Sequence, residues 1–299
     1  MSVRIGIDIG GTKAHAVAFD DEDQVLAEDV RPSGRGDGVA AAARDAVSCL
    51  QREVGAASSL GIGVPGIVDA DAGTVLHAVN LGVEHLDLAA RVADLVDGPV
   101  RIDNDMNAAA LGAFHALGAF HALGASASLA YLNVGTGLAA GLVVDGRLWR
   151  GHGGVAGEVG HLPVDPLGLL CPCGQRGCLE TVASGSALER AWRGSVPFAD
   201  AVAAGDAAAR VIYGRLVHGI TDAVQILVLT AGVAVVVLDG GVVRHLPPLL
   251  GDLRSELAGR GAGSGFLATF DLAARVHAVP PGVSLPALGA ALLPTVPHS

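Results

Sequence analysis

The sequence predicts an α/β fold built from two related lobes. Strand-like and helix-like segments alternate along the chain, which is typical of a mainly parallel sheet covered by helices. A unit of strand, glycine turn and strand occurs at the N-terminus and returns about 125 residues later. The chain has 299 residues, of which 51% are apolar, and this is enough to bury one or two sizeable cores.

The first of these units opens the chain. Apolar residues alternate over residues 3–9, as expected for a strand, and Gly10 and Gly11 follow as a turn. A second strand-like run at 14–19 leads into an acidic turn and a third short strand. Beyond this unit the pattern predicts, in order, a helix at about 37–54, a strand at 60–64, a helix near 87–96 and a strand at 100–102.

The second unit repeats this pattern. A strand-like run at 129–134 precedes the turn Gly135-Thr136-Gly137, and another run at 138–144 ends in a tight turn. A later apolar run, 223–238, has only sixteen residues, fewer than the roughly 20 that a membrane-spanning helix needs. We therefore expect a buried helix end followed by a buried strand near Val235.

Charge and composition exclude several classes of partner. The chain carries 19 basic and 30 acidic residues, a net charge of -11, and its basic residues are scattered singly. Such a charge repels nucleic acid and anionic membrane surfaces. The first strand-like run begins at Val3 and leaves no room for a leader peptide. We therefore expect a cytoplasmic protein with neither a nucleic-acid nor a membrane partner.

The four cysteines fall into two groups. Cys49 lies at the edge of the apolar stripe of a predicted helix, where we interpret it as a packing residue. The other three lie within eight residues of one another and follow a histidine. Three cysteines and one histidine form a closed four-ligand set that suits a structural Zn²⁺ ion. The predicted zinc ligands are His161, Cys171, Cys173 and Cys178, and the ion would hold the flanking carboxylates of Glu158 and Glu180 in place.

Glycine turns are the candidates for binding phosphate, because a glycine at a strand end lets backbone N–H groups approach an anion closely. The first turn follows Asp8, whose carboxylate suits a hydrated Mg²⁺, and the second is Gly135-Thr136-Gly137. Taken alone, the first fits an ordinary glycine turn equally well, and it is neither a P-loop nor a dinucleotide fingerprint. The third candidate turn, Gly240-Gly241, suits either contact with a nucleoside or a plain turn at the end of a strand.

Polar residues follow the predicted strand at 100–102. Acids and amides in this position point into the crevice where ligands bind in open α/β sheets. A carboxylate there, such as that of Asp105, can accept the proton of an attacking hydroxyl. Asp103 or Asn104 can instead cap a helix that begins near Asn107, and capping accounts for one of these residues but not for the whole set.

Together these motifs resemble those of the ROK family (repressors, open reading frames and kinases). The resemblance extends from D-I-G-G-T-K at Asp8 to A-L-G-A-A-L-L at 287–293, and N-D-M-N-A-A-A-L-G at 104–112 is among its most specific parts. It implies a two-lobed actin-like ATPase fold of the ribonuclease H-like type, with a structural zinc loop. It further implies a homodimer, a small lobe at 1–105, a large lobe at 106–284 and a C-terminal helix at 285–299 that packs back on the small lobe.

The resemblance also implies an ATP-dependent kinase that phosphorylates a hexose hydroxyl. Asp105 matches the family's general base, and His161 would use one ring nitrogen for zinc and the other for a sugar hydroxyl. The implied sugar-binding residues are Gly66, Asn80, Asn104, Asp105, Glu158, His161 and Glu180. The residues implied for ATP and Mg²⁺ are Asp8, Gly10, Gly11, Thr12, Lys13, Gly135, Thr136, Gly137, Gly240 and Gly241.

Some residues depart from the family pattern. Ala139 and Ala140 stand where its kinases usually carry glycines, Asp239 replaces another glycine and adds negative charge, and Val83 stands where an aromatic residue is common. These departures bear on nucleotide affinity, turnover and the identity of the phosphoryl donor. A repeated hexapeptide, GAFHAL at 112–117 and again at 118–123, lengthens the helix behind Asp105, and its two histidines do not share a helix face.

The sequence leaves the acceptor open. Glucose, giving glucose 6-phosphate, is the first expectation; N-acetylglucosamine or N-acetylmannosamine is the second, and fructose a weaker third. A catalytically silent sugar-binding or regulatory member of the family is the alternative from another class, because the glycine turns are altered. A repressor is disfavoured, since only seven residues precede Asp8, too few for a helix-turn-helix module, and the chain is acidic.

Overall fold

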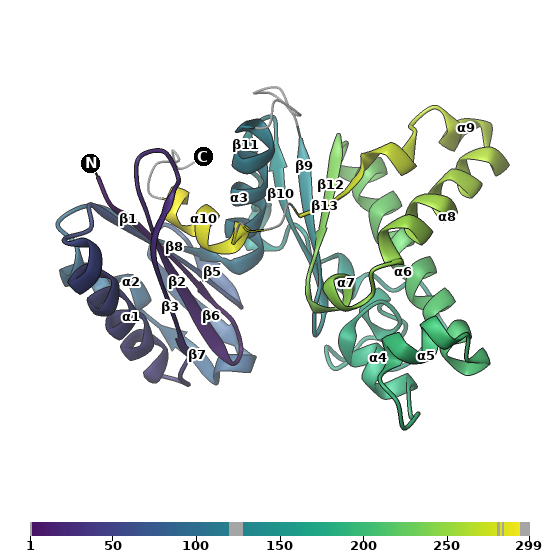
Figure 1. Ribbon diagram of the computed structural model, residues 1–299, viewed down its shortest axis with the longest axis horizontal. Helices are drawn as coiled ribbons and strands as arrows, with labels where there is room; N and C mark the ends of the chain where they lie inside the picture. The colour runs from purple at the N-terminus through teal and green to yellow at the C-terminus, as the bar shows by residue number, and fades with distance from the viewer. Residues whose placement is uncertain (1, 120–127, 280–281, 283, 294–299) are drawn as a thin grey trace. The chain divides into compact units, whose positions relative to one another are not determined.

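The computed structural model describes residues 2–119, 128–279, 282 and 284–293 (Figure 1). These residues form two compact units. Unit 1 comprises residues 2–119, 141–156, 282 and 284–293, and unit 2 comprises residues 128–140 and 157–279. The lobe boundary expected from the family resemblance falls after residue 105. In the structure the helix that follows and the segment 141–156 form part of unit 1, and the backbones of Gly141 and Met106 lie in close contact.

A five-stranded sheet forms the centre of unit 1. Its order is β3-β2-β1-β4-β8, with β1 antiparallel to β2 and parallel to β4. The strands lie where the sequence pattern placed them, although β3 and β8 continue further than predicted. Their bounds are β1 (Arg4–Ile9), β2 (Lys13–Phe19), β3 (Val25–Pro32), β4 (Ser59–Val64) and β8 (Val100–Asn104).

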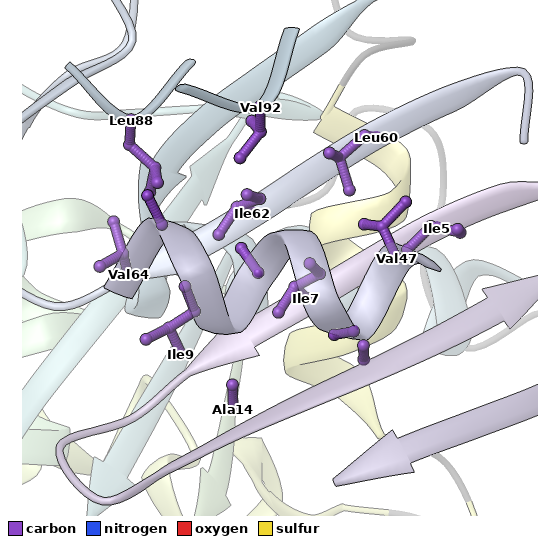
Figure 2. Close-up of a cluster of buried hydrophobic side chains, with 14 of the residues drawn as sticks. Ile5, Ile7, Ile9, Ala14, Val47, Leu60, Ile62, Val64, Leu88 and Val92 are labelled. Atoms are coloured by element: carbon purple, nitrogen blue, oxygen red, sulfur yellow. The ribbon is translucent and has the colours of Figure 1, made fainter. Parts of the chain in front are cut away.

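One face of this sheet is covered by helix α1 (Gly38–Val54). Ile5, Ile7 and Ile9 are fully buried, as their alternation predicted, and they pack in one cluster with the apolar stripe of α1 (Figure 2). Val47 belongs to that stripe, whose residues recur at helical spacing. Cys49 is half-buried and carries a free thiol, which agrees with its interpretation as a packing residue.

The opposite face of β1 is covered by helix α10 (Leu285–Leu292), which also packs on helix α3 (Asp105–Ala119) (Figure 1). The three elements approach so closely that glycine is required at the contacts. A Cβ atom on Gly6 would lie 1.9 Å from the carbonyl oxygen of Ala287, and one on Gly112 would lie 2.0 Å from that of Leu285. Backbone atoms cannot move aside as side chains can, so any larger residue would separate the elements.

Unit 1 also contains a small antiparallel sheet that the sequence analysis did not predict. It consists of β5 (Ile67–Asp69), β6 (Thr74–Ala78) and β7 (Val83–Leu86), with the 3₁₀ turn η1 (Val79–Leu81) between the last two. These strands are too short for alternation to be visible in the sequence. The single helix predicted near 87–96 is divided into α2 (Leu88–Val92) and the 3₁₀ turn η2 (Ala93–Leu95).

The second large sheet has the strand order β11-β10-β9-β12-β13, which repeats that of the first sheet. In the first sheet β1 lies between β2 and β4, and in the second sheet β9 lies between β10 and β12 in the same way. The prediction of two related units is thus confirmed at the level of topology. The bounds are β9 (Leu129–Val134), β10 (Leu138–Val144, which continues from unit 2 into unit 1), β11 (Arg147–Leu148), β12 (Val235–Asp239) and β13 (Val276–Ala278).

Helices and 3₁₀ turns make up most of the rest of unit 2. They are η4 (Val159–His161), η5 (Leu179–Thr181), α4 (Gly185–Ala191), α5 (Phe198–Ala204), α6 (Ala207–Ala231), α7 (Gly241–His245), α8 (Leu249–Gly263), α9 (Gly265–Ala268) and η6 (Leu272–Arg275); η3 (His152–Gly154) belongs to unit 1. By length and composition α6 could cross a membrane, but half of its most apolar window is buried inside the protein. The apolar run at 223–238 divides into the end of α6 and strand β12, as predicted.

The repeated hexapeptide provides a matched test of the close packing in unit 1. Gly112 and Gly118 occupy the same position in the two GAFHAL copies. A Cβ atom added at Gly112 would collide with backbone atoms, whereas one added at Gly118 would have no neighbour within 4 Å. We expect Gly112→Ala to lower the free energy of unfolding by about 1–3 kcal/mol. Gly118→Ala should raise it by up to about 1 kcal/mol, because alanine favours helix. Denaturant unfolding of both variants checks this, and equal effects would contradict the packing. Residues 120–123 of the second copy lie outside the described residues.

Candidate active site and metal centre

The predicted polar residues occupy the junction between β8 and α3 in unit 1. Asp103 is only 2% exposed, and its carboxylate accepts four hydrogen bonds. Oδ1 accepts from the Asn104 N–H (2.8 Å) and from Asn107 Nδ2 (2.9 Å). Oδ2 accepts from Nε (2.9 Å) and Nη2 (2.6 Å) of Arg150. Such a charge-paired carboxylate fixes the start of the helix.

Asn104 and Asp105 follow directly. Asn104 Oδ1 accepts from the Met106 N–H at 2.9 Å, so the capping alternative holds for Asn104. Its Nδ2 donates to the carbonyl oxygen of Gly66 at 3.1 Å. α3 begins at Asp105, two residues earlier than predicted, and Asp105 Oδ1 accepts from the Met106 N–H at 3.0 Å. Three predicted acceptor-binding residues, Gly66, Asn104 and Asp105, therefore lie together.

The first glycine turn closes the β1–β2 hairpin. The Gly10 N–H donates to the Lys13 carbonyl oxygen at 2.8 Å. A Cβ atom on Gly11 would lie 3.4 Å from the Cβ of Asn80, so this turn lies beside another predicted sugar contact. Asp8 occupies the last part of β1, one residue before the strand ends. The Asp8 carboxylate supplies the oxygen ligand that Mg²⁺ prefers, and backbone N–H groups of a glycine turn suit a phosphate.

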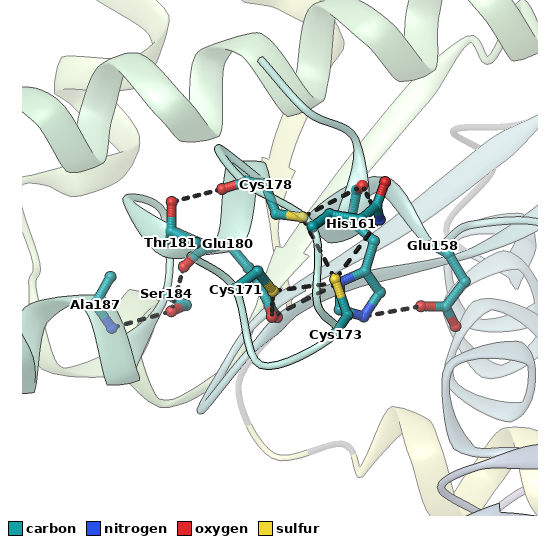
Figure 3. Close-up of polar contacts among 10 residues, drawn as sticks. Glu158, His161, Cys171, Cys173, Cys178, Glu180, Thr181, Ser184 and Ala187 are labelled. Atoms are coloured by element: carbon teal, nitrogen blue, oxygen red, sulfur yellow. Dashed lines mark hydrogen bonds and ion pairs between the residues drawn. The ribbon is translucent and has the colours of Figure 1, made fainter. Parts of the chain in front are cut away.

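In unit 2, His161, Cys171, Cys173 and Cys178 offer four ligand atoms that all lie within 4.8 Å of one another (Figure 3). The Cys173 and Cys178 sulfurs are 3.6 Å apart, and Cys171 Sγ lies 3.8 Å from His161 Nδ1. A tetrahedral zinc site with Zn–S bonds of about 2.3 Å requires sulfur–sulfur distances of roughly 3.8 Å. The donor set and the spacing of the four ligand atoms therefore fit a tetrahedral zinc ion.

The thiols of this cluster differ in acidity in the absence of metal. Burial raises the pKa of Cys171 to about 12 and also raises the pKa of Cys178. The backbone hydrogen bond from Gln175 lowers the pKa of Cys173 to about 6. Zinc binds thiolates, so binding would displace the protons of the two buried thiols.

Two predicted sugar-binding carboxylates lie beside the candidate metal ligands. His161 turns Nδ1 towards Cys171, while its Nε2 lies 3.9 Å from Glu158 Oε2 (Figure 3). Glu180 Oε1 accepts from the Cys171 thiol at 3.1 Å and lies 3.7 Å from His161 Nδ1. With zinc on Nδ1, the Nε2 nitrogen would carry the proton and could donate it to a ligand.

The remaining glycine turns of unit 2 lie at one edge of its sheet. β9 and β12 are adjacent and parallel, so the turns at 135–137 and 240–241 follow the carboxyl ends of neighbouring strands. The Gly135 and Thr136 carbonyl oxygens accept from the first N–H groups of α4, at 2.8 and 3.1 Å. Gly240 has φ +109°, and a Cβ atom there would lie 2.4 Å from the Val134 carbonyl oxygen. Glycine is therefore required at Gly240.

Of the departures from the family pattern, Asp239 has a structural explanation. Ala139 and Ala140 lie within β10, beyond the turn at 135–137. Asp239 is 4% exposed, and Oδ2 accepts from the Tyr131 hydroxyl at 2.7 Å. Arg244 pairs with Asp239 Oδ1 through Nε (3.0 Å) and Nη2 (2.7 Å). The charge added by Asp239 is thus paired with an arginine, which the sequence analysis did not foresee.

Two further residues were missed by sequence reasoning. Asn133 lies beside both glycine turns: a Cβ on Gly135 would lie 3.2 Å from Asn133 Nδ2, and one on Gly240 would lie 2.6 Å from its Oδ1. Alignment of the two strand–turn–strand units would have placed Asn133 opposite Asp8. Arg150, which binds Asp103, left no local signal, because its partner lies 47 residues away in the sequence.

The comparisons with known proteins define the class to which this fold and site belong. The chain belongs to the ROK family, whose model matches residues 4–293. A ROK hexokinase from Thermus thermophilus superposes with a TM-score of 0.77 at 32% identity, covering 97% of each chain. A ROK family glucokinase from Streptomyces griseus, in complex with glucose and AMPPNP, gives 0.78 at 29% identity, covering 98% of this chain and 99% of that one. These likenesses confirm the predicted α/β, actin-like fold.

Relatives in sequence include both enzymes and regulators. A glucokinase from Streptomyces coelicolor is 37% identical over 195 residues, covering 64% of this chain, which spans about 59% of the length of that protein. An N-acetylmannosamine kinase from Citrobacter koseri is 33% identical, covering 75% of this chain and 73% of the relative. A xylose repressor from Caldicellulosiruptor bescii is 37% identical, covering 62% of this chain and 47% of the repressor.

The metal centre can be tested with cysteine variants. We expect the purified protein to hold about one equivalent of zinc, and Cys178→Ser to lose it and to unfold at a lower temperature, because a structural zinc ion contributes folding free energy. Cys49→Ser is the matched control and should keep both the metal and the stability. Elemental analysis by mass spectrometry measures the zinc, and a Cys178→Ser variant that still carries a full equivalent would contradict the assignment.

Proposed function

We propose that this protein phosphorylates a hexose hydroxyl with ATP, with Asp105 as the general base. The observation that carries the proposal is the cluster of Gly66, Asn104 and Asp105 at the β8–α3 junction, which Asp103 and Arg150 hold in place. A carboxylate at the start of a helix, beside an oriented amide, is suited to bind a sugar hydroxyl and take its proton. The glucose and AMPPNP complex of a relative at 29% identity supports the same class of reaction.

The residues then take distinct roles. Asp105 accepts the proton of the attacking hydroxyl, and Asn104, with its side chain fixed at both ends, orients the sugar. Glu158, Glu180 and His161 Nε2 bind further hydroxyls, and an analogue that lacks one of these hydroxyls would leave a polar group unpaired. When bound with ATP, Mg²⁺ would neutralise charge on the phosphates, and Asp8 is the residue that we assign to hold it.

Glucose is the acceptor that we propose first, because relatives from two Streptomyces species carry the name glucokinase. N-acetylmannosamine or N-acetylglucosamine is the alternative, supported by a relative named N-acetylmannosamine kinase. A sugar-binding protein without turnover is the candidate of another class, supported by likeness to a xylose repressor. A homodimer, on family grounds, and a cytoplasmic location, on the grounds of the sequence, remain part of the proposal.

The kinase proposal is tested by Asp105→Asn. We expect ADP release from Mg–ATP with glucose to fall by about 10²–10⁴-fold, because the general base is lost. Calorimetry should still detect sugar binding, since the amide keeps the shape of the carboxylate. Asp97→Asn, at an exposed position outside the motif, is the control and should keep wild-type turnover.

The same assay, run with glucose, N-acetylglucosamine, N-acetylmannosamine, mannose and fructose, identifies the acceptor. Full activity of Asp105→Asn would exclude Asp105 as the base. Sugar binding without turnover for every sugar would replace the kinase proposal with the sugar-binding alternative.

A further inference from the structure

A pocket of about 620 Å³ lies within unit 1, outside the residues assigned above to the acceptor and to ATP. Its walls are residues 67–71 of β5 and the turn after it, Leu76 of β6, and residues 148–154. Small-molecule sites in proteins have volumes of roughly 300–1,000 Å³. The pocket is therefore large enough for a ligand of its own.

Two residues of the pocket wall connect it to the proposed acceptor residues. Ile67 in its wall directly follows Gly66, whose carbonyl oxygen accepts from Asn104. Arg150, also in its wall, binds the Asp103 carboxylate. All of these residues belong to unit 1. A ligand in the pocket would thus lie next to the sugar whose hydroxyl faces Asp105.

The lining has the chemistry of a carbohydrate site. Trp149 is 47% exposed, and within the described part of the chain its indole N–H has no hydrogen-bond partner. The C–H face of a sugar ring packs against an aromatic ring, while the indole N–H can donate to a hydroxyl. The His152 ring likewise has no partner among the described residues, and Gly151, Gly153 and Gly154 keep their part of the wall free of side chains.

Charge restricts the ligand further. Asp69 and Asp71 line the pocket, and the positive charge of Arg150 is paired with Asp103. The Asp69 carboxylate accepts hydrogen bonds from two backbone N–H groups, those of Asp71 and Ala72, and keeps its negative charge, which disfavours a phosphate or a carboxylate in the ligand. A neutral polyol fits, because carboxylates accept hydrogen bonds from hydroxyls.

We propose that this pocket is a second carbohydrate subsite, which binds a further neutral sugar ring attached to the hexose. The acceptor class then extends from free hexoses to neutral disaccharides. The subsite rests on the proposed function only for the position of the first ring; Trp149 and the pocket are independent of turnover.

The chain offers a direct reporter, because it has only two tryptophans, Trp149 and Trp192. Trp192 belongs to unit 2, where its ring meets that of Phe198 edge to face, at a centroid distance of 5.7 Å. In Trp192→Phe, the emission therefore comes from Trp149 alone. We expect maltose or cellobiose, titrated without ATP, to shield Trp149 from acrylamide and to bind about tenfold more tightly than glucose. In Trp149→Phe, the emission of Trp192 should not respond.

Calorimetry with Trp149→Ala completes the test. We expect this variant to lose about tenfold in disaccharide affinity while its glucose affinity stays within about twofold, and Trp149→Phe, which keeps an aromatic face, to lose less than threefold. The subsite is overturned if neither disaccharide binds more tightly than glucose, or if Trp149→Ala leaves disaccharide affinity unchanged; glucose turnover that depends on Asp105 would still uphold the kinase. Disaccharide binding at Trp149 in a protein that phosphorylates no sugar would support the subsite and reject the kinase.

Discussion

The pairing of Asp103 with Arg150 is the interaction on which the candidate site of unit 1 depends. Each carboxylate oxygen of Asp103 accepts two hydrogen bonds, and together they join the end of β8, the first turn of α3 and the segment around residue 150. Loss of one partner of a buried ion pair typically costs about 3–5 kcal/mol, because the other charge is left unpaired. The pair also fixes geometry, since Asn104 and Asp105 follow Asp103 directly, and Arg150 is part of the pocket wall.

Close packing of glycine and alanine residues of α3, α10 and β1 fixes the position of the helix that begins at this pair. α3 starts at the site and is held against α10 by backbone contacts at Gly112 and Gly289, while Gly6 brings α10 onto β1. The position of the first turn of α3 therefore depends on a segment almost 180 residues further along the chain. Small residues give little apolar area, so the contact gains its stability from the many dispersion contacts of a close approach.

In unit 2 the predicted sugar-binding carboxylates take part in a different kind of interaction. The segment around residues 158–180 contains short 3₁₀ turns and isolated β-bridges in place of a long helix or strand. Four side chains that could hold a zinc ion converge in this segment, and Glu158 and Glu180 lie on either side of the His161 ring. The Asp239 carboxylate is likewise held within unit 2, because it accepts hydrogen bonds from the Tyr131 hydroxyl and from Arg244.

The sequence by itself determined the elements whose signal is local. Alternation located β1 and β2, and helical spacing located α1. The two strand–turn–strand units predicted two related lobes, and cysteine spacing singled out the candidate metal ligands that the fold brings together. Only the tertiary structure decided that Arg150 binds Asp103, that Asp239 pairs with Arg244, that three short strands form a separate sheet, and that Trp149 lines a pocket. The reason is physical: periodicity and ligand spacing are properties of neighbouring residues, whereas ion pairs and pockets depend on side chains that folding brings together from distant parts of the chain.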